Sequence, residues 1–439
     1  MTKASWALLF ALALPSVAAP PAWLPGAVIY EVFPRDFSPS GDLNGVTAGL
    51  DRLHRLGVDV VWLMPIHPVG QVKRKGTLGS PYSVRDYYAI NPDYGTKDDL
   101  KRLVAEAHRR GMKVILDIVA NHTAWDSVMM KTPEFYKHNA AGQIIPPVPE
   151  WDDVAGLDYN DAPLRPYMTD MLSHWVRDFD VDGFRCDAAG MVPLTFWESA
   201  RAEVDKLKPG LLWLAEWHEA SLMAKAFDLD YAWPLHSALA AVFGKGAPAR
   251  DLRTAWEEER TLYPKGALHM RISDDHDEER AIVRFGKGGA LAASAFMFTI
   301  DGVPLLYEGM EVGDTTESGG PPLFEKLPVF WQIAERRPEF PRFYAGMLAL
   351  RHAHAALQQG ETEWLHNSDD ARIVTYLRRG AGEEFLVAIN FSNQPFLGVV
   401  DTAAAGFTEV TPGVEKPRPS ALPALALDAW GYRIFQKSR

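Results

Sequence analysis

Short apolar strands and amphipathic helices alternate along most of this chain, and this pattern limits the fold more than any other feature. Strands are expected at residues 27–33, 59–64, 113–119, 182–187, 211–215, 227–231, 268–273 and 303–307. Helical spacing of apolar residues appears at 46–56, 97–110, 164–179 and 196–207. Apolar strands that alternate with helices indicate a parallel sheet with both faces covered. Eight such strands predict an α/β fold, a closed (β/α)8 TIM barrel, with an open doubly wound sheet as the alternative.

Two connections are too long for simple loops between a strand and a helix. Residues 123–163 follow the third strand and are expected to form a lobe over the barrel mouth, and residues 308–331 follow the eighth strand. Beyond the helix expected at 340–352, the short alternating runs at 373–377, 385–391, 396–400 and 431–435 predict an antiparallel β domain. The predicted organisation is a catalytic barrel at 20–355 with the lobe at 123–163, and a C-terminal β-sandwich domain at 356–439.

The first 19 residues have the features of a signal peptide. Lys3 precedes an apolar stretch at 6–14, and small residues follow it before Pro20. The apolar stretch is too short to span a bilayer, so we expect a secreted or periplasmic protein without a membrane anchor after cleavage, with a retained N-terminal anchor as the alternative. Cys186 is the only cysteine, which excludes an intrachain disulfide.

The charge balance argues against polyanionic partners. The formal net charge is -12, and no run of Lys and Arg is longer than three residues. Nucleic acids and anionic membrane surfaces attract basic patches, so neither is an expected partner. A neutral substrate fits this composition better. The oligomeric state stays open at this stage.

Acidic side chains gather at the predicted strand ends. Asp117, Asp187, Glu216 and Asp277 end four different strands, and barrel geometry brings such positions to one mouth. Arg185 and Asp187 are two residues apart on one strand, so their side chains share a face and form an ion pair. Each acid alone has a structural explanation, such as a helix cap or a surface charge. Together on one face they favour a hydrolytic site.

Four segments resemble the signature regions of the alpha-amylase superfamily, in the same order. They are DIVANH at 117–122, GFRCD at 183–187, LAEW at 214–217 and DHD at 275–277. The segment PYSVRDY at 81–87 resembles the part of the family that presents a stacking tyrosine. The resemblance implies Asp187 as nucleophile, Glu216 as general acid/base and Asp277 as transition-state stabiliser. It also implies sugar-binding roles for four further residues: Tyr82, His122, Arg185 and His276.

These roles agree with the chemistry of a retaining glycosidase. Retention needs one ionised carboxylate to attack the anomeric carbon and one protonated carboxyl group to protonate the leaving oxygen. We expect Arg185 to keep Asp187 ionised, and the apolar neighbours of Glu216 to raise its pKa. An exported retaining α-glycoside hydrolase that cleaves α-1,4 bonds in starch-like glucans or maltooligosaccharides is therefore predicted. An α-glucan transglycosylase or α-glucosidase using the same site is the first alternative, and a non-catalytic carbohydrate-binding or interaction protein is the second.

The sequence departs from the family pattern where calcium-dependent members bind their ion. Gly190 and Met191 follow the nucleophile in place of a Lys-His pair, and Gly156 replaces an acid of the lobe. A separate departure, outside the calcium positions, is Asp275, which stands where Asn is frequent. Calcium prefers about six to eight oxygen ligands, and Gly and Met side chains provide none. We therefore predict that no metal or cofactor is required, with a structural calcium as the alternative.

Overall fold

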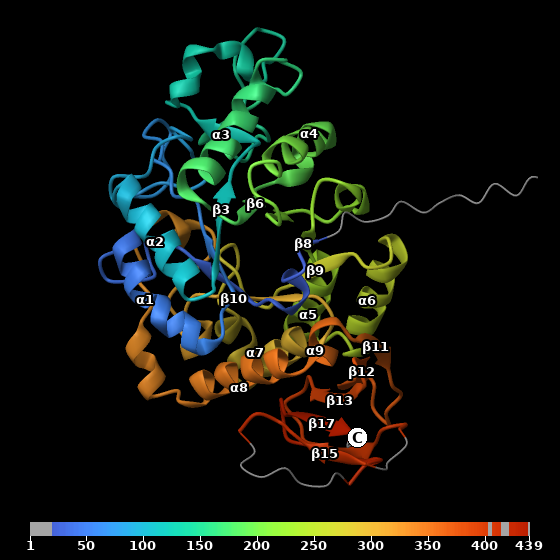
Figure 1. Ribbon diagram of the computed structural model, residues 1–439. Coiled ribbons are helices and arrows are strands. Elements are labelled where there is room, and N and C mark those ends of the chain that lie inside the picture. Colours follow the sequence, from blue (N-terminus) through green and yellow to red (C-terminus); the bar gives the residue numbers. More distant parts are fainter. Residues whose placement is uncertain (1–19, 403–405, 414–420, 438–439) are drawn as a thin grey trace, which may run out of the picture.

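A closed barrel of eight parallel strands forms the centre of the protein, which confirms the predicted fold class (Figure 1). A computed structural model describes residues 20–402, 406–413 and 421–437, so the predicted signal peptide at 1–19 lies outside the described residues. Around the barrel, hydrogen-bonded neighbours follow the order β1, β10, β9, β8, β7, β6, β3, β2. These strands are β1 (Ile29–Val32), β2 (Val60–Leu63), β3 (Lys113–Ile118), β6 (Gly183–Cys186), β7 (Leu212–Ala215), β8 (Leu229–Tyr231), β9 (Leu268–Arg271) and β10 (Val303–Tyr307).

Helices cover the outer face of the barrel. They are α1 (Leu43–Leu56), α2 (Lys97–Arg109), α3 (Leu164–Phe179), α4 (Leu194–Val204), α5 (Trp233–Lys245), α6 (Arg250–Leu262), α7 (Ala281–Thr299), α8 (Glu339–Ala353) and α9 (Ala355–Gln359). α1 begins three residues before the predicted start because the Asp42 side chain accepts the N–H of Gly45 and caps the helix. α2 begins with a capping box in which Thr96 and Asp99 each accept the other's backbone N–H.

Two layers of apolar side chains hold the barrel and its helices together. One cluster fills the barrel interior and includes Trp62, Leu214 and Met270, all fully buried. The other lies between the strands and the surrounding helices. Strands buried on both faces explain why the sequence reads as nearly continuous apolar runs.

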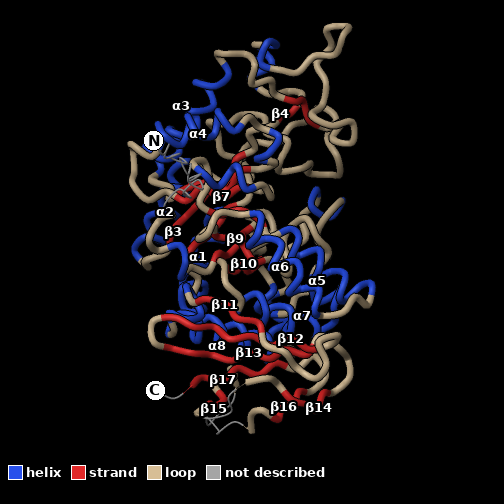
Figure 2. The backbone as a smooth tube through the Cα atoms, turned by 90° about the vertical axis from the view of Figure 1, so that its right-hand side faces the viewer, coloured by secondary structure: helices blue, strands red, loops and turns tan. Residues whose placement is uncertain are grey.

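The inserted lobe and the C-terminal domain lie at opposite ends of the molecule, as Figures 1 and 2 agree. The lobe contains the antiparallel pair β4 (His122–Ala124) and β5 (Val154–Gly156). The C-terminal domain has a five-stranded sheet, in the order β11, β12, β13, β17, β15, and the separate pair β14 and β16. These strands are β11 (Glu361–Trp364), β12 (Ile373–Gly380), β13 (Glu383–Asn390), β14 (Phe396–Val399), β15 (Phe407–Glu409), β16 (Ala424–Leu427) and β17 (Tyr432–Lys437).

One apolar cluster joins the two sheets of the C-terminal domain, with members such as Leu386 on β13 and Leu425 on β16. Helix α9 crosses the predicted domain boundary at residues 355 and 356, and that boundary stays a prediction. Within the described part of the chain, no helix combines the length and the apolar character needed to cross a bilayer.

Candidate active site

Arg185, on β6, joins the carboxylates of three neighbouring strand ends. Its Nη1 donates to Asp117 Oδ1 at 2.9 Å and to Asp187 Oδ1 at 3.0 Å. Its Nη2 lies 3.0 Å from Glu216 Oε1 in an ion pair, and its Nε donates to the Tyr231 hydroxyl at 3.2 Å. The guanidinium is fully buried, so it fixes these groups without competition from water. The contact between Arg185 and Asp187 is the one expected from their strand spacing.

Asp187 and Glu216 have different proton affinities, although they share one arginine. Burial raises the pKa of Asp187 to about 6 against the pull of Arg185, and the charge of Asp117 adds to the increase. Burial likewise raises the pKa of Glu216 to about 7, with Arg185 opposing it and Asp187 adding to it. The increase at Glu216 was expected from its apolar neighbours. Arg185 favours the ionised form of Asp187, as expected, but desolvation and Asp117 outweigh it, so the pKa of Asp187 lies above its usual value.

His276 connects the third carboxylate to the site. Its Nδ1 pairs with Glu31, and its Nε2 lies 3.2 Å from Asp277 Oδ2. Burial alone would lower the pKa of His276, but the charges of Asp277 and Glu31 raise it well above the usual value. Burial alone would raise the pKa of Asp277, whereas His276 holds it at about 2. The Asp277 side chain is 44% exposed, so a permanent negative charge faces the open cleft.

Tyr82 and His122 complete the predicted sugar-binding set. The Tyr82 ring stacks on His276, with 5.4 Å between centroids, and its hydroxyl donates to Asp117 Oδ2 at 3.1 Å. Burial lowers the pKa of His122 to about 4, so its imidazole is neutral near pH 7. The seventh predicted residue, Arg185, makes polar contacts with Asp187 and Glu216. The other six line one cleft: Tyr82, His122, Asp187, Glu216, His276 and Asp277.

Both long connections contribute to this cleft, as their positions in the sequence predict. Trp151 comes from the lobe, and Phe324 comes from the connection after β10. The Trp151 ring packs edge-on against His122, with 5.6 Å between centroids, and remains 38% exposed. An exposed indole beside the reacting site offers an apolar surface for a pyranose ring. Both aromatic residues stand out in the sequence of their long connections, but no local pattern marks either one as part of the cleft.

Lys75 links the loop after β2 to the lobe. Its Nζ lies 3.0 Å from Asp152 Oδ1 and 2.9 Å from Asp153 Oδ1, and it donates to the Glu150 carbonyl at 3.2 Å. Lys75 and Asp153 also line the cleft. Sequence reasoning missed this residue, because nothing in the local pattern separates it from other loop lysines.

The turn after Asp187 has an unusual backbone conformation. Ala188 adopts a left-handed conformation, with φ of 43°, and its N–H donates to Glu216 Oε2 at 2.7 Å. Such a conformation costs roughly 1 kcal/mol or more in a residue with a Cβ and is concentrated at functional sites. Gly190, two residues later, packs under Trp217, and a Cβ at this position would lie 2.1 Å from the indole. The turn and the segment of Glu216 therefore fit closely together.

The residues at the family's calcium position suit the ion poorly. The Asn121 side-chain nitrogen donates to the Met191 sulfur at 3.8 Å, so a soft thioether lies where an oxygen ligand is needed. Gly156 provides no side-chain oxygen, Asp158 accepts a backbone N–H within its own turn, and Asp152 and Asp153 pair with Lys75. Calcium independence remains a prediction that the experiments below address.

Comparisons with known proteins agree with this geometry. The family model described as alpha amylase, catalytic domain, matches residues 28–141 and 150–372. A cyclomaltodextrinase from a Bacillus species is 29% identical over 420 residues, which cover 84% of this chain and 74% of the relative.

Two solved structures are similar to the chain in both fold and sequence. A noncanonic maltogenic alpha-amylase from Thermotoga neapolitana is 30% identical with a TM-score of 0.82, and the match covers 94% of this chain and 96% of the other. An alpha-amylase from Lactobacillus plantarum is 31% identical with a TM-score of 0.84, and the match covers 94% and 99%. The chain belongs to the alpha-amylase family of glycoside hydrolases.

Proposed function

We propose that this protein is a retaining α-glycoside hydrolase that cleaves α-1,4 bonds in starch-like glucans or maltooligosaccharides. One observation carries the proposal: a buried arginine holds the carboxyl groups of Asp187 and Glu216 at one cleft, and burial raises the pKa of Glu216 to about 7, so that it can carry a proton near neutral pH. Enzymes that use two carboxyl groups separate acid and base roles in this way. Three carboxylates at one cleft support an enzyme over a non-catalytic binding protein.

In the proposed first step, the carboxyl group of Glu216 donates its proton to the glycosidic oxygen, and the bond from that oxygen to the anomeric carbon breaks. The Asp187 carboxylate attacks the same carbon from the opposite face and forms a covalent glycosyl ester. In the second step, Glu216 removes a proton from water, and the resulting nucleophile displaces Asp187. The anomeric configuration is retained, because each step inverts it once.

Asp277 and its neighbours support the transition state. The charge on Asp277 strengthens hydrogen bonds from sugar hydroxyls as the ring gains positive charge, so its effect is larger in the transition state than in the ground state. His276 keeps this carboxylate ionised, and the Tyr82 ring offers a face to the sugar.

Transfer of the glycosyl unit to another sugar is the second candidate activity. The covalent intermediate accepts a hydroxyl as readily as water when an acceptor sugar is bound. The exposed Trp151 ring at the cleft supports an acceptor site. Trp151→Ala should therefore lower the ratio of transfer to hydrolysis at high maltooligosaccharide concentration, and an unchanged ratio would remove this support.

The proposed activity is tested by incubating the purified protein with α-1,4, α-1,6 and mixed glucans and resolving the products by length. Proton NMR of the first product identifies its anomer. We expect α-anomeric products from α-1,4 glucans, and none from a folded Asp187→Asn variant. A β-anomer formed first would exclude retention.

We also propose that the protein is exported, on the basis of residues 1–19 alone. The mature form should then begin near Pro20. Sequencing the N-terminus of protein recovered outside the cytoplasm tests this, and a mature chain that begins at Met1 would contradict it.

A further inference from the structure

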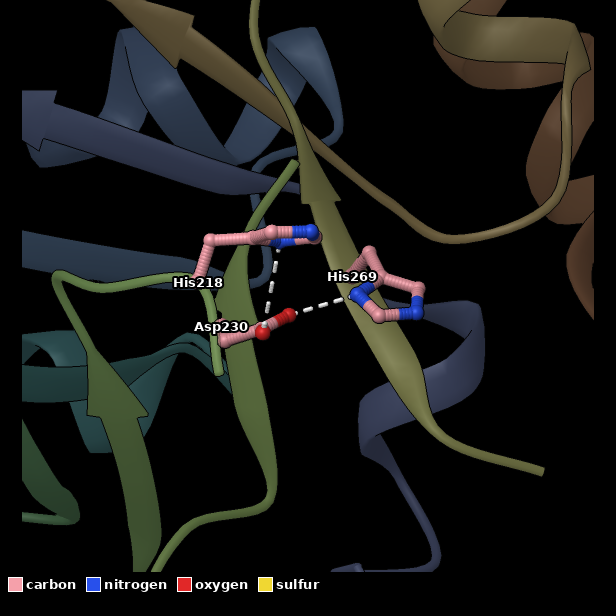
Figure 3. Close-up of side chains that lie close together, drawn as sticks. All are labelled: His218, Asp230 and His269. Carbon is pink, nitrogen blue, oxygen red and sulfur yellow. Dashed lines mark hydrogen bonds and ion pairs between the residues drawn. The ribbon is translucent and has the colours of Figure 1, made fainter. Parts of the chain in front are cut away.

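A second group of potential ligand side chains lies outside the barrel wall, away from the cleft. Its members are Asp230 on β8, His269 on β9 and His218 after β7, and Figure 3 shows them gathered around the Asp230 carboxylate. Asp230 and His269 are register partners on adjacent strands. Tyr231 points into the barrel and reaches Arg185, so the preceding residue, Asp230, points to the outer face. The catalytic residues described above make no use of this group.

Two of the three side chains, those of Asp230 and His218, carry an atom without a hydrogen bond. Asp230 is fully buried, yet its Oδ2 has no hydrogen bond and lies 3.8 Å from His218 Nδ1. The Nδ1 of His218 lies 3.1 Å from the Tyr231 carbonyl, so it carries the hydrogen and donates. This leaves His218 Nε2 with a free lone pair, and it too has no partner. One donor atom from each of the three residues lies within 4.8 Å of the others.

The surrounding residues form a second layer around this group. His269 Nδ1 contacts Asp230 Oδ1 at 2.5 Å, and its Nε2 lies 3.7 Å from Glu259 Oε1. Arg271 pairs with the same glutamate at 2.8 Å and balances its charge. A cavity lined by Glu259, Tyr263 and His269 leads to this region from solvent, and the Tyr263 hydroxyl interacts with the Asp230 carboxylate.

We propose that His218, Asp230 and His269 bind one transition-metal dication of the zinc class. Two imidazoles and one carboxylate are a donor set that zinc uses, whereas calcium and magnesium prefer oxygen alone. Histidine ligands typically donate their other ring N–H to a carbonyl or carboxylate. His218 already donates in this way to a carbonyl, and His269 has Glu259 within reach of its second nitrogen.

The ion replaces the proton between His269 and Asp230. In a tetrahedral site with bonds of about 2.1 Å, ligand atoms lie about 3.4 Å apart. The 2.5 Å contact must widen by about 0.9 Å, and a separation at the 4.8 Å upper limit must contract by about 1.4 Å, which rotation of side chains provides. The fourth position is open to water from the cavity or to the Tyr263 hydroxyl.

The proposed site has a structural role. His218 follows the proton donor Glu216 by two residues, so an ion here ties that segment to β8 and β9. None of the three proposed metal-binding side chains reaches the cleft, because all three lie on the outer face of the barrel strands. Metal content and thermal stability therefore report on the site without any measurement of activity.

The test uses the full chain, stripped with a chelator, exposed to zinc chloride and freed of excess zinc by gel filtration. Metal analysis of the protein by mass spectrometry should find about one zinc ion per chain. The zinc-loaded protein should have a Tm about 2 °C or more above that of the chelated protein. His218→Gln should lose both effects; its side chain is 17% exposed, so this variant is expected to fold. Asp230→Asn serves as a second variant.

His54→Gln is the matched control, because His54 is an exposed histidine on α1, away from the group. This variant should retain zinc as the wild type does. The proposal is overturned if the wild type retains no zinc, or if His218→Gln retains as much zinc as the wild type. Binding of several equivalents that no variant reduces would indicate surface adsorption and also overturn it.

Discussion

The two carboxyl groups held by Arg185 predict a narrow, bell-shaped dependence of kcat/KM on pH. Asp187 must be ionised to attack, and its pKa is about 6, so activity falls as the pH drops through that value. Glu216 must carry a proton, and its pKa is about 7, so activity falls as the pH rises through that value. With these two values, the active protonation state holds about 0.6 of the enzyme near pH 6.5 and about 0.09 near pH 5 and pH 8, a roughly sevenfold fall on each side.

Initial rates on a maltooligosaccharide far below KM, measured between about pH 4 and pH 10 at fixed ionic strength, give this profile for the free enzyme. Asp117→Asn provides a directional check, because the charge of Asp117 is one cause of the raised pKa of Asp187. The acid limb should move to lower pH in this variant. A flat profile from pH 5 to pH 8, or an acid limb that moves upward, would refute the assignment of these two groups.

Three further changes test other parts of the site. Glu216→Gln should reduce kcat about 10²–10⁴-fold on natural glucans and much less on aryl glycosides with good leaving groups, because only the former need the proton; equal losses would count against the donor role. Gly190→Ala should lower both Tm and activity, because the new Cβ would collide with the Trp217 ring, whereas Gly244→Ala has open space around it and should be neutral or stabilising; equal behaviour of the two variants would contradict the close fit. Calcium added to chelated protein should change neither Tm nor activity, and recovery at micromolar calcium would reveal a set of ligands other than those described.

The barrel could be predicted because its strands are buried on both faces and therefore appear as short apolar runs. The helices between the later strands could not be predicted in the same way. α7 is buried on nearly all sides, contains many alanines and glycines, and is kinked at Gly286, so no helical stripe of apolar residues stands out. Local capping also shifted boundaries, as Asp42 does for α1.

The sequence predicts those residues of the candidate site whose positions follow from the ends of the barrel strands. Barrel geometry alone brings Asp187, Glu216 and Asp277 to one mouth. The pKa of Asp187 could not be predicted, because its direction depends on burial and on Asp117, which is distant along the chain. The position of Lys75 depends on the conformation of two long loops, which no local pattern encodes.

At the edge of the cleft, Lys75 holds the lobe to the loop after β2 through ion pairs with Asp152 and Asp153. Its side chain is 35% exposed and that of Asp152 is 70% exposed, and ion pairs this open to water contribute only about 0–1 kcal/mol. Dissolved salt weakens this exposed pair first, whereas the pair with Asp153, whose side chain is 9% exposed, is screened less. We expect long glucans to gain easier access to the carboxylates when these ion pairs, which border the cleft, are weakened. The lengths of the products made at low and at high ionic strength should differ for this reason, although the catalytic groups remain the same.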